Sequence, residues 1–128
     1  MPVVSVRYNP KISHAELKAL LPTLSTTLAK QLTCKHDGKD IVITPKMVKV
    51  RFDVASELDT FADLHIEVEA RAFEARFPKL NSYSAELAAA IAPLIKENVS
   101  ISVWYKLCRA SWYPETINVE SAIKPSTS

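Results

Sequence analysis

The chain has 128 residues, 48% of them hydrophobic, and its 16 basic and 14 acidic side chains leave a formal net charge of +2. This length fits a single domain whose core needs neither disulfides nor a metal. The near balance of charge gives no support for binding to nucleic acid or to an anionic membrane surface. The single glycine, Gly38, excludes glycine-rich phosphate loops, and with them ordinary nucleotide hydrolases and Rossmann enzymes.

The cysteines and the hydropathy pattern favour a cytoplasmic protein. Cys34 and Cys108 stand far apart, without CxxC or Cys/His spacing, so we expect neither a disulfide framework nor a metal site. No signal peptide is visible, and no apolar stretch is long enough to span a bilayer.

The first third of the chain predicts a strand followed by a long helix. Residues 3–8 alternate between apolar and polar side chains, which is typical of a half-buried strand. Ser13 and Glu16 match a capping box, and leucines follow at helical spacing to about Thr33. Because Pro22 lies inside this stretch, we expect a kink or a break there.

The middle of the chain predicts a polar turn and three strands. Residues 34–40 read as a turn region, and residues 41–44 as a short extra strand. Residues 48–54 and 64–71 both alternate cleanly between apolar and polar side chains, so each predicts a strand with one buried face.

A second helix and a last strand complete the pattern. Residues 81–98 are rich in alanine and predict a helix with Asn81 or Ser82 as its cap, although Pro93 lies inside it. Residues 99–107 alternate again and predict the last strand.

The element order is β-α-β-β-α-β, which predicts an α+β two-layer sandwich. We divide a single domain, residues 1–128, into a βαβ unit at 2–54, a second at 63–113 and a polar tail at 114–128. Right-handed crossovers would place both helices on one face of a four-stranded sheet. The two halves correspond loosely, which suggests an internal duplication.

The other face of this sheet would be polar. A solvated face is one interpretation. The other is a face buried against a partner subunit, with its charges paired and some left to bind an anionic ligand. Its side chains are Ser5, Arg7, Lys49, Arg51, Asp53, His65, Glu67, Glu69, Arg71, Ser100, Ser102, Trp104 and Lys106.

Pro2 has either an ordinary or a chemical role. Proline is tolerated as the first residue of a strand. If Met1 is removed, however, Pro2 becomes a secondary amine at the end of the chain. The pKa of an α-amino group is roughly 7.7–8.0. Burial and nearby cations lower this pKa. Such an amine suits a general base near neutral pH. A retained Met1 would instead make the Pro2 nitrogen an amide without basicity.

Lys49 and Arg51 project from one face of the same predicted strand. Arginine holds a carboxylate with two parallel hydrogen bonds, and lysine offers a point charge. They could therefore bind a substrate carboxylate, or they could form cross-strand ion pairs with Glu67 and Glu69. The sequence leaves both interpretations open.

Three stretches in this order, "MPVVSV", "VKVRF" and "LHIEVEA", carry a resemblance. Over residues 2–113 the chain resembles the tautomerase superfamily, most closely its two-unit 5-carboxymethyl-2-hydroxymuconate isomerase type. The resemblance implies a cofactor-independent enzyme that forms a homotrimer. It also implies a small carboxylic acid as substrate, such as a 2-hydroxy-dienoate or another keto or enol acid.

The same resemblance assigns roles to individual residues. Pro2 would be the general base, and Arg51 would hold the substrate carboxylate. Lys49 is the rival if the register shifts by two, and Lys11 would weakly replace an arginine that follows the first strand in the short members. Arg71 and Arg76 lie at the equivalent point after the third strand. Trp104 would wall a pocket or interface, or pack at an edge.

Two alternatives remain. The chain could have the tautomerase fold without its activity and serve as an oligomeric scaffold. It could also be a ferredoxin-like binding module with the same element order. An RNA-recognition domain would need stacking aromatic residues on its central strands, where this chain has glutamates and a histidine.

Overall fold

The computed structural model describes residues 2–96 and 98–109. Among these residues, no helix combines the length and the hydropathy that crossing a bilayer would require. The expected polar tail at 114–128 lies outside the described residues. The elements are β1 (Val3–Tyr8), α1 (His14–Leu32), β2 (Cys34–His36), β3 (Lys39–Ile41), β4 (Lys49–Val54), β5 (Leu64–Arg71), α2 (Leu80–Ile91) and β6 (Ile101–Cys108).

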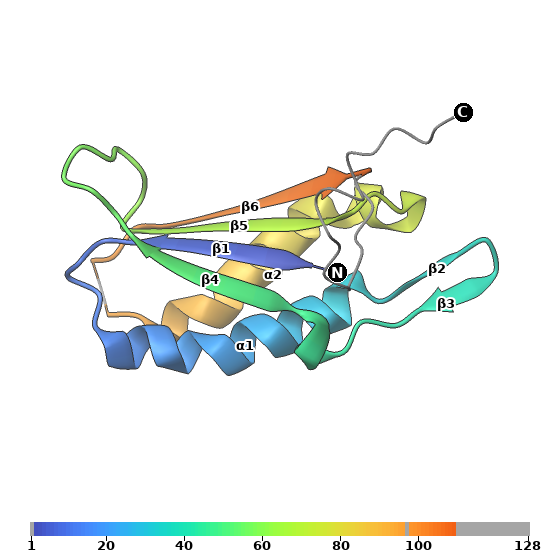
Figure 1. Ribbon diagram of the computed structural model, residues 1–128, viewed down its shortest axis with the longest axis horizontal. Helices are drawn as coiled ribbons and strands as arrows, with labels where there is room; N and C mark the ends of the chain where they lie inside the picture. The colour runs from blue at the N-terminus through green and yellow to red at the C-terminus, as the bar shows by residue number, and fades with distance from the viewer. Residues whose placement is uncertain (1, 97, 110–128) are drawn as a thin grey trace, which may run out of the picture.

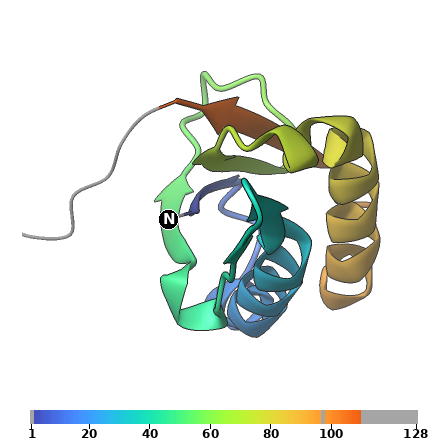
Figure 2. The same ribbon diagram turned by 90° about the vertical axis from the view of Figure 1, so that its right-hand side faces the viewer.

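Four strands form one mixed sheet in the order β4-β1-β5-β6. β1 is parallel to β4, β5 is parallel to β6, and the two pairs meet where β1 runs antiparallel to β5. Helices α1 and α2 both cover the same face of the sheet (Figures 1 and 2). The predicted two-layer α+β sandwich is therefore confirmed.

The sheet order separates this fold from a ferredoxin-like domain. There the two strands of a βαβ unit are split by another strand. Here the strands of each unit are direct neighbours, β1 with β4 and β5 with β6. The alternative of a ferredoxin-like module is wrong for this topology.

The core lies between the sheet and the helices. Alternation along the strands and helical spacing along α1 turn the apolar side chains toward this layer. Each fully buried Leu, Ile or Val contributes about 1.5–3 kcal/mol relative to an exposed one. The leucine stripe of α1 faces the alternate apolar residues of β1 and β5. The residues without measurable exposure are Val4, Val6, Leu20, Leu24, Leu28, Leu32, Leu64, Ile66, Val68, Leu87 and Ile91.

Helix α1 begins with the predicted capping box. The Ser13 hydroxyl oxygen accepts the Glu16 amide at 3.2 Å, and a Glu16 carboxylate oxygen accepts the Ser13 amide at 3.1 Å. The helix passes through Pro22 without a break. Pro22 is exposed, so the buried leucines on the opposite side hold the turns around it together.

Helix α2 differs from its prediction at both ends. It begins at Leu80 with Lys79 as an uncapped N-terminal residue, because a 3₁₀ helix at Glu74–Lys79 runs directly into it. Neither Asn81 nor Ser82 is the cap. It ends at Ile91 and continues as a single 3₁₀ turn, because a proline at position 93 cannot donate the helical hydrogen bond.

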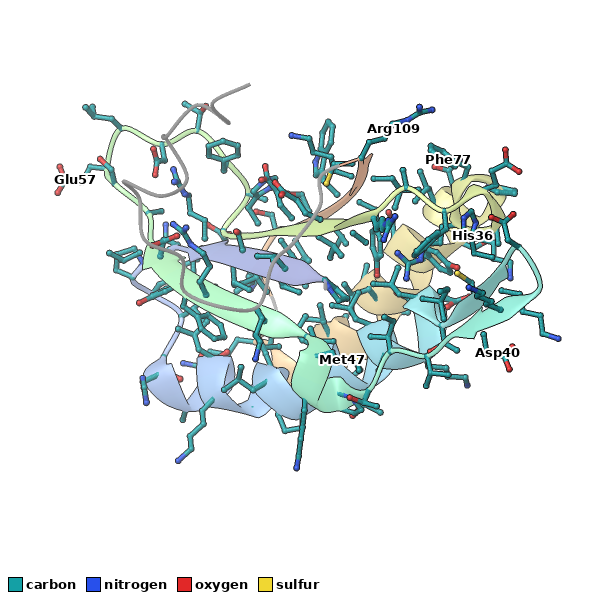
Figure 3. The ribbon with its side chains drawn as sticks, turned by 45° about the vertical axis from the view of Figure 1, so that its right-hand side comes forward. His36, Asp40, Met47, Glu57, Phe77 and Arg109 are labelled. Carbon is teal, nitrogen blue, oxygen red and sulfur yellow. The ribbon has the colours of Figure 1, made fainter. Side chains whose placement is uncertain are left out.

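The region read as a polar turn is a β-hairpin. β2 pairs with β3 from Cys34 to Ile41, so the short strand lies earlier than predicted. Asp37 and Gly38 form its tip with φ angles of 50° and 75°. An Asp-Gly pair of this kind is a strong hairpin signal that the sequence reading missed. His36 and Asp40 lie on this arm (Figure 3).

Arg76 ties the end of α1 to the end of β5. It is only 2% exposed, yet its guanidinium donates to the Leu32 carbonyl through Nε at 3.1 Å and Nη2 at 2.6 Å. Nη1 donates to the Arg71 carbonyl at 2.8 Å. The guanidinium also lies 4.9 Å from the ring centre of Phe73. Its donors hold backbone at the end of the sheet where Pro2 lies.

Replacing Arg76 by methionine should lower the free energy of unfolding by about 3 kcal/mol. The variant removes both guanidinium donors from the buried Leu32 carbonyl, and an unsatisfied buried group costs about 1–3 kcal/mol. It also removes the charged donor from the Arg71 carbonyl, which still accepts the Phe73 amide at 2.9 Å, and a hydrogen bond to a charged group contributes about 1.5–3 kcal/mol. Urea unfolding at equilibrium measures the change. The exposed Lys18→Met on α1 is the control and should stay within about 0.5 kcal/mol of the wild type. A loss below about 1 kcal/mol for Arg76→Met would contradict this role.

Candidate functional site

The polar face of the sheet is an ordered grid, because the strand register aligns its outward side chains. One row crosses the sheet at Pro2's end, one crosses its middle, and one crosses the end next to the β4–β5 loop. From β4 to β6 these rows are Lys49–Val3–Glu69–Lys106, Arg51–Ser5–Glu67–Trp104 and Asp53–Arg7–His65–Ser102.

A hollow of about 260 Å³ lies on this face, over β4, β1 and β5. The β4–β5 loop contributes Phe61 to its wall, and the ring centre of Phe61 lies 4.7 Å from that of His65. Two arginines and two carboxylates line the hollow, so their charges balance. The lining residues are Ser5, Arg7, Arg51, Asp53, Phe61, His65 and Glu67.

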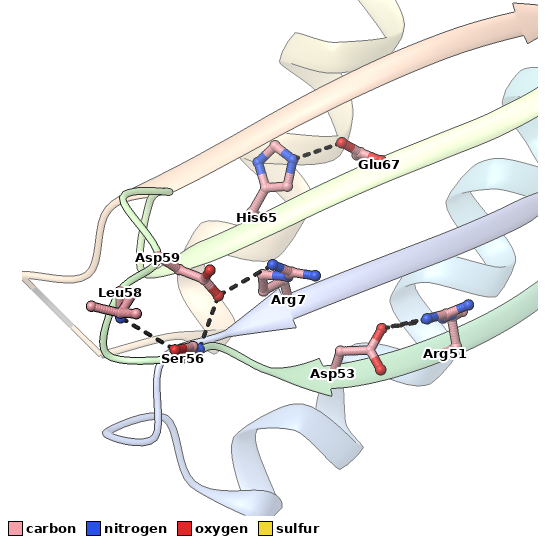
Figure 4. Close-up of polar contacts among 8 residues, drawn as sticks. All are labelled: Arg7, Arg51, Asp53, Ser56, Leu58, Asp59, His65 and Glu67. Carbon is pink, nitrogen blue, oxygen red and sulfur yellow. Dashed lines mark hydrogen bonds and ion pairs between the residues drawn. The ribbon is translucent and has the colours of Figure 1, made fainter.

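Both arginines of the hollow are paired. Arg51 donates to Asp53 on its own strand, with Nη2 to Oδ2 at 2.9 Å (Figure 4). Arg7 donates to Asp59 of the β4–β5 loop at 3.2 Å, and its guanidinium lies 5.5 Å from the ring centre of Phe61. The cross-strand pairing considered for Arg51 with Glu67 is thus replaced by a pair within β4.

Pro2 lies buried at the other end of β1 from this loop. Its carbonyl accepts the Lys49 amide at 3.0 Å. Since Val3 pairs with Glu69 in antiparallel register, the last residues of β5, up to Arg71, lie beside the start of β1. Lys49 Nζ lies 3.5 Å from the Lys46 carbonyl. Lys49 and Arg71 are both exposed, so the fold brings two solvent-accessible cationic groups to Pro2's end of the sheet.

Arg71 and Arg76 have different surroundings although they are close in sequence. The Arg71 guanidinium lies 5.0 Å from the ring centre of Phe73 and stays exposed. Arg76 is buried and donates to backbone carbonyls, as described above. Of the two, only Arg71 has a guanidinium that solvent, and therefore a ligand, can reach.

Lys11 lies at the opposite end of β1 from Pro2, beyond a strand of six residues that spans about 20 Å. Its Nζ contacts Asp63 Oδ2 at 3.0 Å. Asp63 also accepts hydrogen bonds from the backbone and hydroxyl of Ser100 at 3.1 and 3.2 Å. The Ser100 amide, and then Lys11, lower the pKa of the Asp63 carboxyl.

One cluster of functional groups was not found by sequence reasoning. His65 is 7% exposed, its Nδ1 lies 2.5 Å from Ser102 Oγ, and its Nε2 lies 3.1 Å from Glu67 Oε1. Ser102 is 37 residues from His65 in the sequence, so only the β5–β6 register brings the two together. The sequence did carry one signal for this cluster: His65 and Glu67 are two residues apart on a predicted strand, so their side chains share one face.

Trp104 lies beside this cluster with 66% of its surface exposed. Most of its surface is therefore not packed against the described residues. Among the described residues, no group of three or more His, Cys, Asp or Glu side chains is arranged to hold a metal ion.

Replacing Asp63 by asparagine should destabilise the fold at pH 7, with a deficit that shrinks in acid. The folded-state pKa of Asp63 lies below the ordinary value of 3.8, so its ionised form stabilises the fold above pH 3.8. This stabilisation is lost as the pH falls through the folded-state pKa. Urea unfolding at neutral and strongly acidic pH measures it. The exposed Glu57→Gln should show no such change, and an equal Asp63→Asn deficit at both pH values would contradict the prediction.

Comparison with known proteins gives a result at the level of structure only. No protein-family model matches the sequence, and no curated protein matches it. The chain is similar to MIF2 of Leishmania major, with a TM-score of 0.58 and 17% identity over 91% of this chain and 96% of that one.

Two further structures are similar. A fused 4-OT wild-type symmetric trimer has a TM-score of 0.54 and 11% identity over 95% of this chain and 99% of that one. A protein of unknown function from Vibrio cholerae has a TM-score of 0.54 and 15% identity over 88% of this chain and 84% of that one. At such identities the likeness concerns the fold. The chain has the tautomerase-like βαβ fold that the sequence predicted.

Proposed function

We propose that this chain belongs to the tautomerase superfamily and moves a proton within a small keto or enol acid, without a cofactor. The observation that carries the proposal is the position of Pro2, which is buried at the start of β1 in a tautomerase-like fold. The 5-carboxymethyl-2-hydroxymuconate isomerase type, with a 2-hydroxy-dienoate as substrate, is the finer form of this proposal. A cytoplasmic location stays a prediction.

In the proposed reaction, Pro2 acts as a terminal secondary amine. Met1 lies outside the described residues, so its removal is part of the proposal. The neutral amine takes a proton from the enol hydroxyl or from the carbon next to the carbonyl. The resulting ammonium then returns the proton to another carbon of the conjugated system. Proton transfer by a positioned base of this kind accelerates a reaction by about 10²–10⁴-fold.

Lys49 and Arg71 are the residues that we propose to hold the substrate carboxylate. Both are exposed and lie on strands that flank the start of β1, so their charges are available at Pro2's end of the sheet. Arg51 is two residues further along β4 and is paired with Asp53. Lys11 lies at the far end of β1 and contacts Asp63. Within one chain these last two are weaker candidates.

We also propose a homotrimer. Among the described residues, strands β4 and β6 form the two edges of the sheet, and the backbone groups on their outer sides can extend the sheet with strands of other subunits. Val54 on β4 leaves an apolar side chain exposed at this edge, with 59% exposure. The solved 4-OT relative in fold is a trimer. An oligomeric scaffold without activity would show the same edges, so only an assay separates the two functions.

The state of the Pro2 nitrogen should decide activity. A protein with a C-terminal tag should have lost Met1 by intact mass and should convert a 2-hydroxy-2,4-dienoate, seen as decay of the dienol absorbance. The same tag fused uncleavably before Pro2 makes its nitrogen an amide, which cannot accept a proton. The value of kcat/KM should then fall by roughly 10²–10⁴-fold.

The two tagged proteins are matched in composition, and circular dichroism should show the same fold in both. Equal activity of the two would refute Pro2 as the base. A free Pro2 amine with no activity on any of a series of keto and enol acids would favour the scaffold.

Lys49→Met and Arg71→Met should each raise KM for the dienoate by roughly 10–100-fold, because a hydrogen bond to a charged group contributes about 1.5–3 kcal/mol. The value of kcat should change less, since neither residue moves the proton. Steady-state kinetics on the C-terminally tagged protein measure both. Lys18→Met, exposed on α1, is the control for loss of a positive charge. An unchanged KM in both variants would remove these residues from the site.

A further inference from the structure

A second group of reactive side chains lies on strands β5 and β6, away from Pro2. His65 and Glu67 project from β5, and Ser102 and Trp104 project from β6 directly opposite them. His65 Nδ1 lies 2.5 Å from Ser102 Oγ, and His65 Nε2 lies 3.1 Å from Glu67 Oε1. Serine, histidine and carboxylate thus form one continuous chain of hydrogen bonds, of which Figure 4 shows the His65–Glu67 link.

The carboxylate fixes which nitrogen of His65 carries the proton. An ionised carboxylate only accepts hydrogen bonds, so Nε2 of the neutral ring must donate to Glu67. Nδ1 is then left with its lone pair, and the Ser102 hydroxyl donates to it. A nucleophile within hydrogen-bond reach of a base, with the base oriented by a third group, is the arrangement that activates serine for covalent catalysis.

The ring of His65 is also held rigidly. It is 7% exposed, and it lies against Phe61, whose ring centre is 4.7 Å away. On its β1 side lies Arg7, which is occupied by Asp59 at 3.2 Å and so does not compete for Glu67. Ser102, in contrast, is partly exposed, so a small molecule can reach its hydroxyl.

The surroundings of Ser102 indicate the class of substrate. Trp104 is the next side chain on the same face of β6, and it is 66% exposed. Its indole can contact a flat apolar group bound at Ser102. The neighbouring charges of the hollow, Arg7, Arg51, Asp53 and Glu67, balance one another, so an uncharged substrate fits this face better than an ion.

We propose that Ser102, His65 and Glu67 form a second catalytic site that hydrolyses small uncharged esters with an aromatic or apolar group. Ser102 Oγ bonds to the acyl carbon while His65 Nδ1 takes the hydroxyl proton. The C–O bond to the alcohol breaks, and the alcohol leaves with that proton. Water then bonds to the acyl carbon and gives a proton to His65. The bond between the acyl carbon and Ser102 Oγ breaks, and His65 returns the proton to that oxygen as the acid is released.

Labelling with a fluorophosphonate tests this site independently of turnover. The probe reacts with an activated serine, since the Oγ–P bond forms as the P–F bond breaks and fluoride leaves. Intact mass and peptide mapping of the full-length protein should show a single adduct on Ser102. Hydrolysis of p-nitrophenyl acetate and p-nitrophenyl butyrate by the same protein should be blocked by the label.

Two variants probe different residues of this chain of hydrogen bonds. Ser102→Ala removes the nucleophile and should abolish the adduct, while His65→Gln keeps the hydroxyl but removes the base and should slow labelling by roughly 100-fold or more. Ser82→Ala, an exposed serine on α2, is the control and should label like the wild type. Circular dichroism verifies that each variant is folded.

Three results would overturn the proposal: a wild type that does not label, an adduct that persists in Ser102→Ala, or unchanged labelling in folded His65→Gln. The result of the labelling test is independent of the result of the Pro2 test. Conversion of a dienoate should be the same in Ser102→Ala and wild type, and blocking the Pro2 nitrogen should leave Ser102 labelling intact.

Discussion

The antiparallel pairing of β1 with β5 is the contact on which the rest of the structure depends. Each βαβ unit closes one parallel pair by itself, but only this pairing joins the two pairs into one sheet. It brings the apolar sides of all four strands to one face, where α1 and α2 share a single core. A one-residue slip would turn every side chain of one unit to the wrong face, so burial of the core also fixes the register.

That register determines both candidate sites. It sets the start of β1 beside the end of β5, which gives Pro2 the neighbours Lys49 and Arg71. It also puts His65 between Arg7 on one side and Ser102 on the other. The hydrophobic pattern that stabilises the helix-covered face fixes the strand register. The same register therefore determines which polar groups are neighbours on the opposite face.

Most of the fold was predictable because it follows from side-chain periodicity. The alternation of β1 and β5 and the leucine stripe of α1 each report burial directly, and the capping box fixed the start of α1. The start of α2 was not predictable in this way, since the 3₁₀ helix before it leaves no extended residue for a cap. The Asp37–Gly38 pair at the hairpin tip is typical of a tight hairpin turn, but the prediction did not use this pattern.

The site was less predictable, because ion pairing depends on contacts distant in sequence. The loop residue Asp59 pairs with Arg7, 52 residues away, and no local pattern reports that contact. The same holds for Ser102 and His65, 37 residues apart. Residue type and strand face could be assigned from alternation, but the partner of each charge could not.

The two proposed sites lie at different places on one rigid sheet, and this separation has a physical basis. Pro2 is buried and follows the inward alternation of Val4 and Val6, whereas His65 projects outward near the other end of β1. An amine that must be neutral gains from burial and from nearby cations. A histidine base gains from a carboxylate on its second nitrogen, which Glu67 supplies. Since these environments oppose each other electrostatically, the two groups are better served at opposite ends of the sheet than in one pocket.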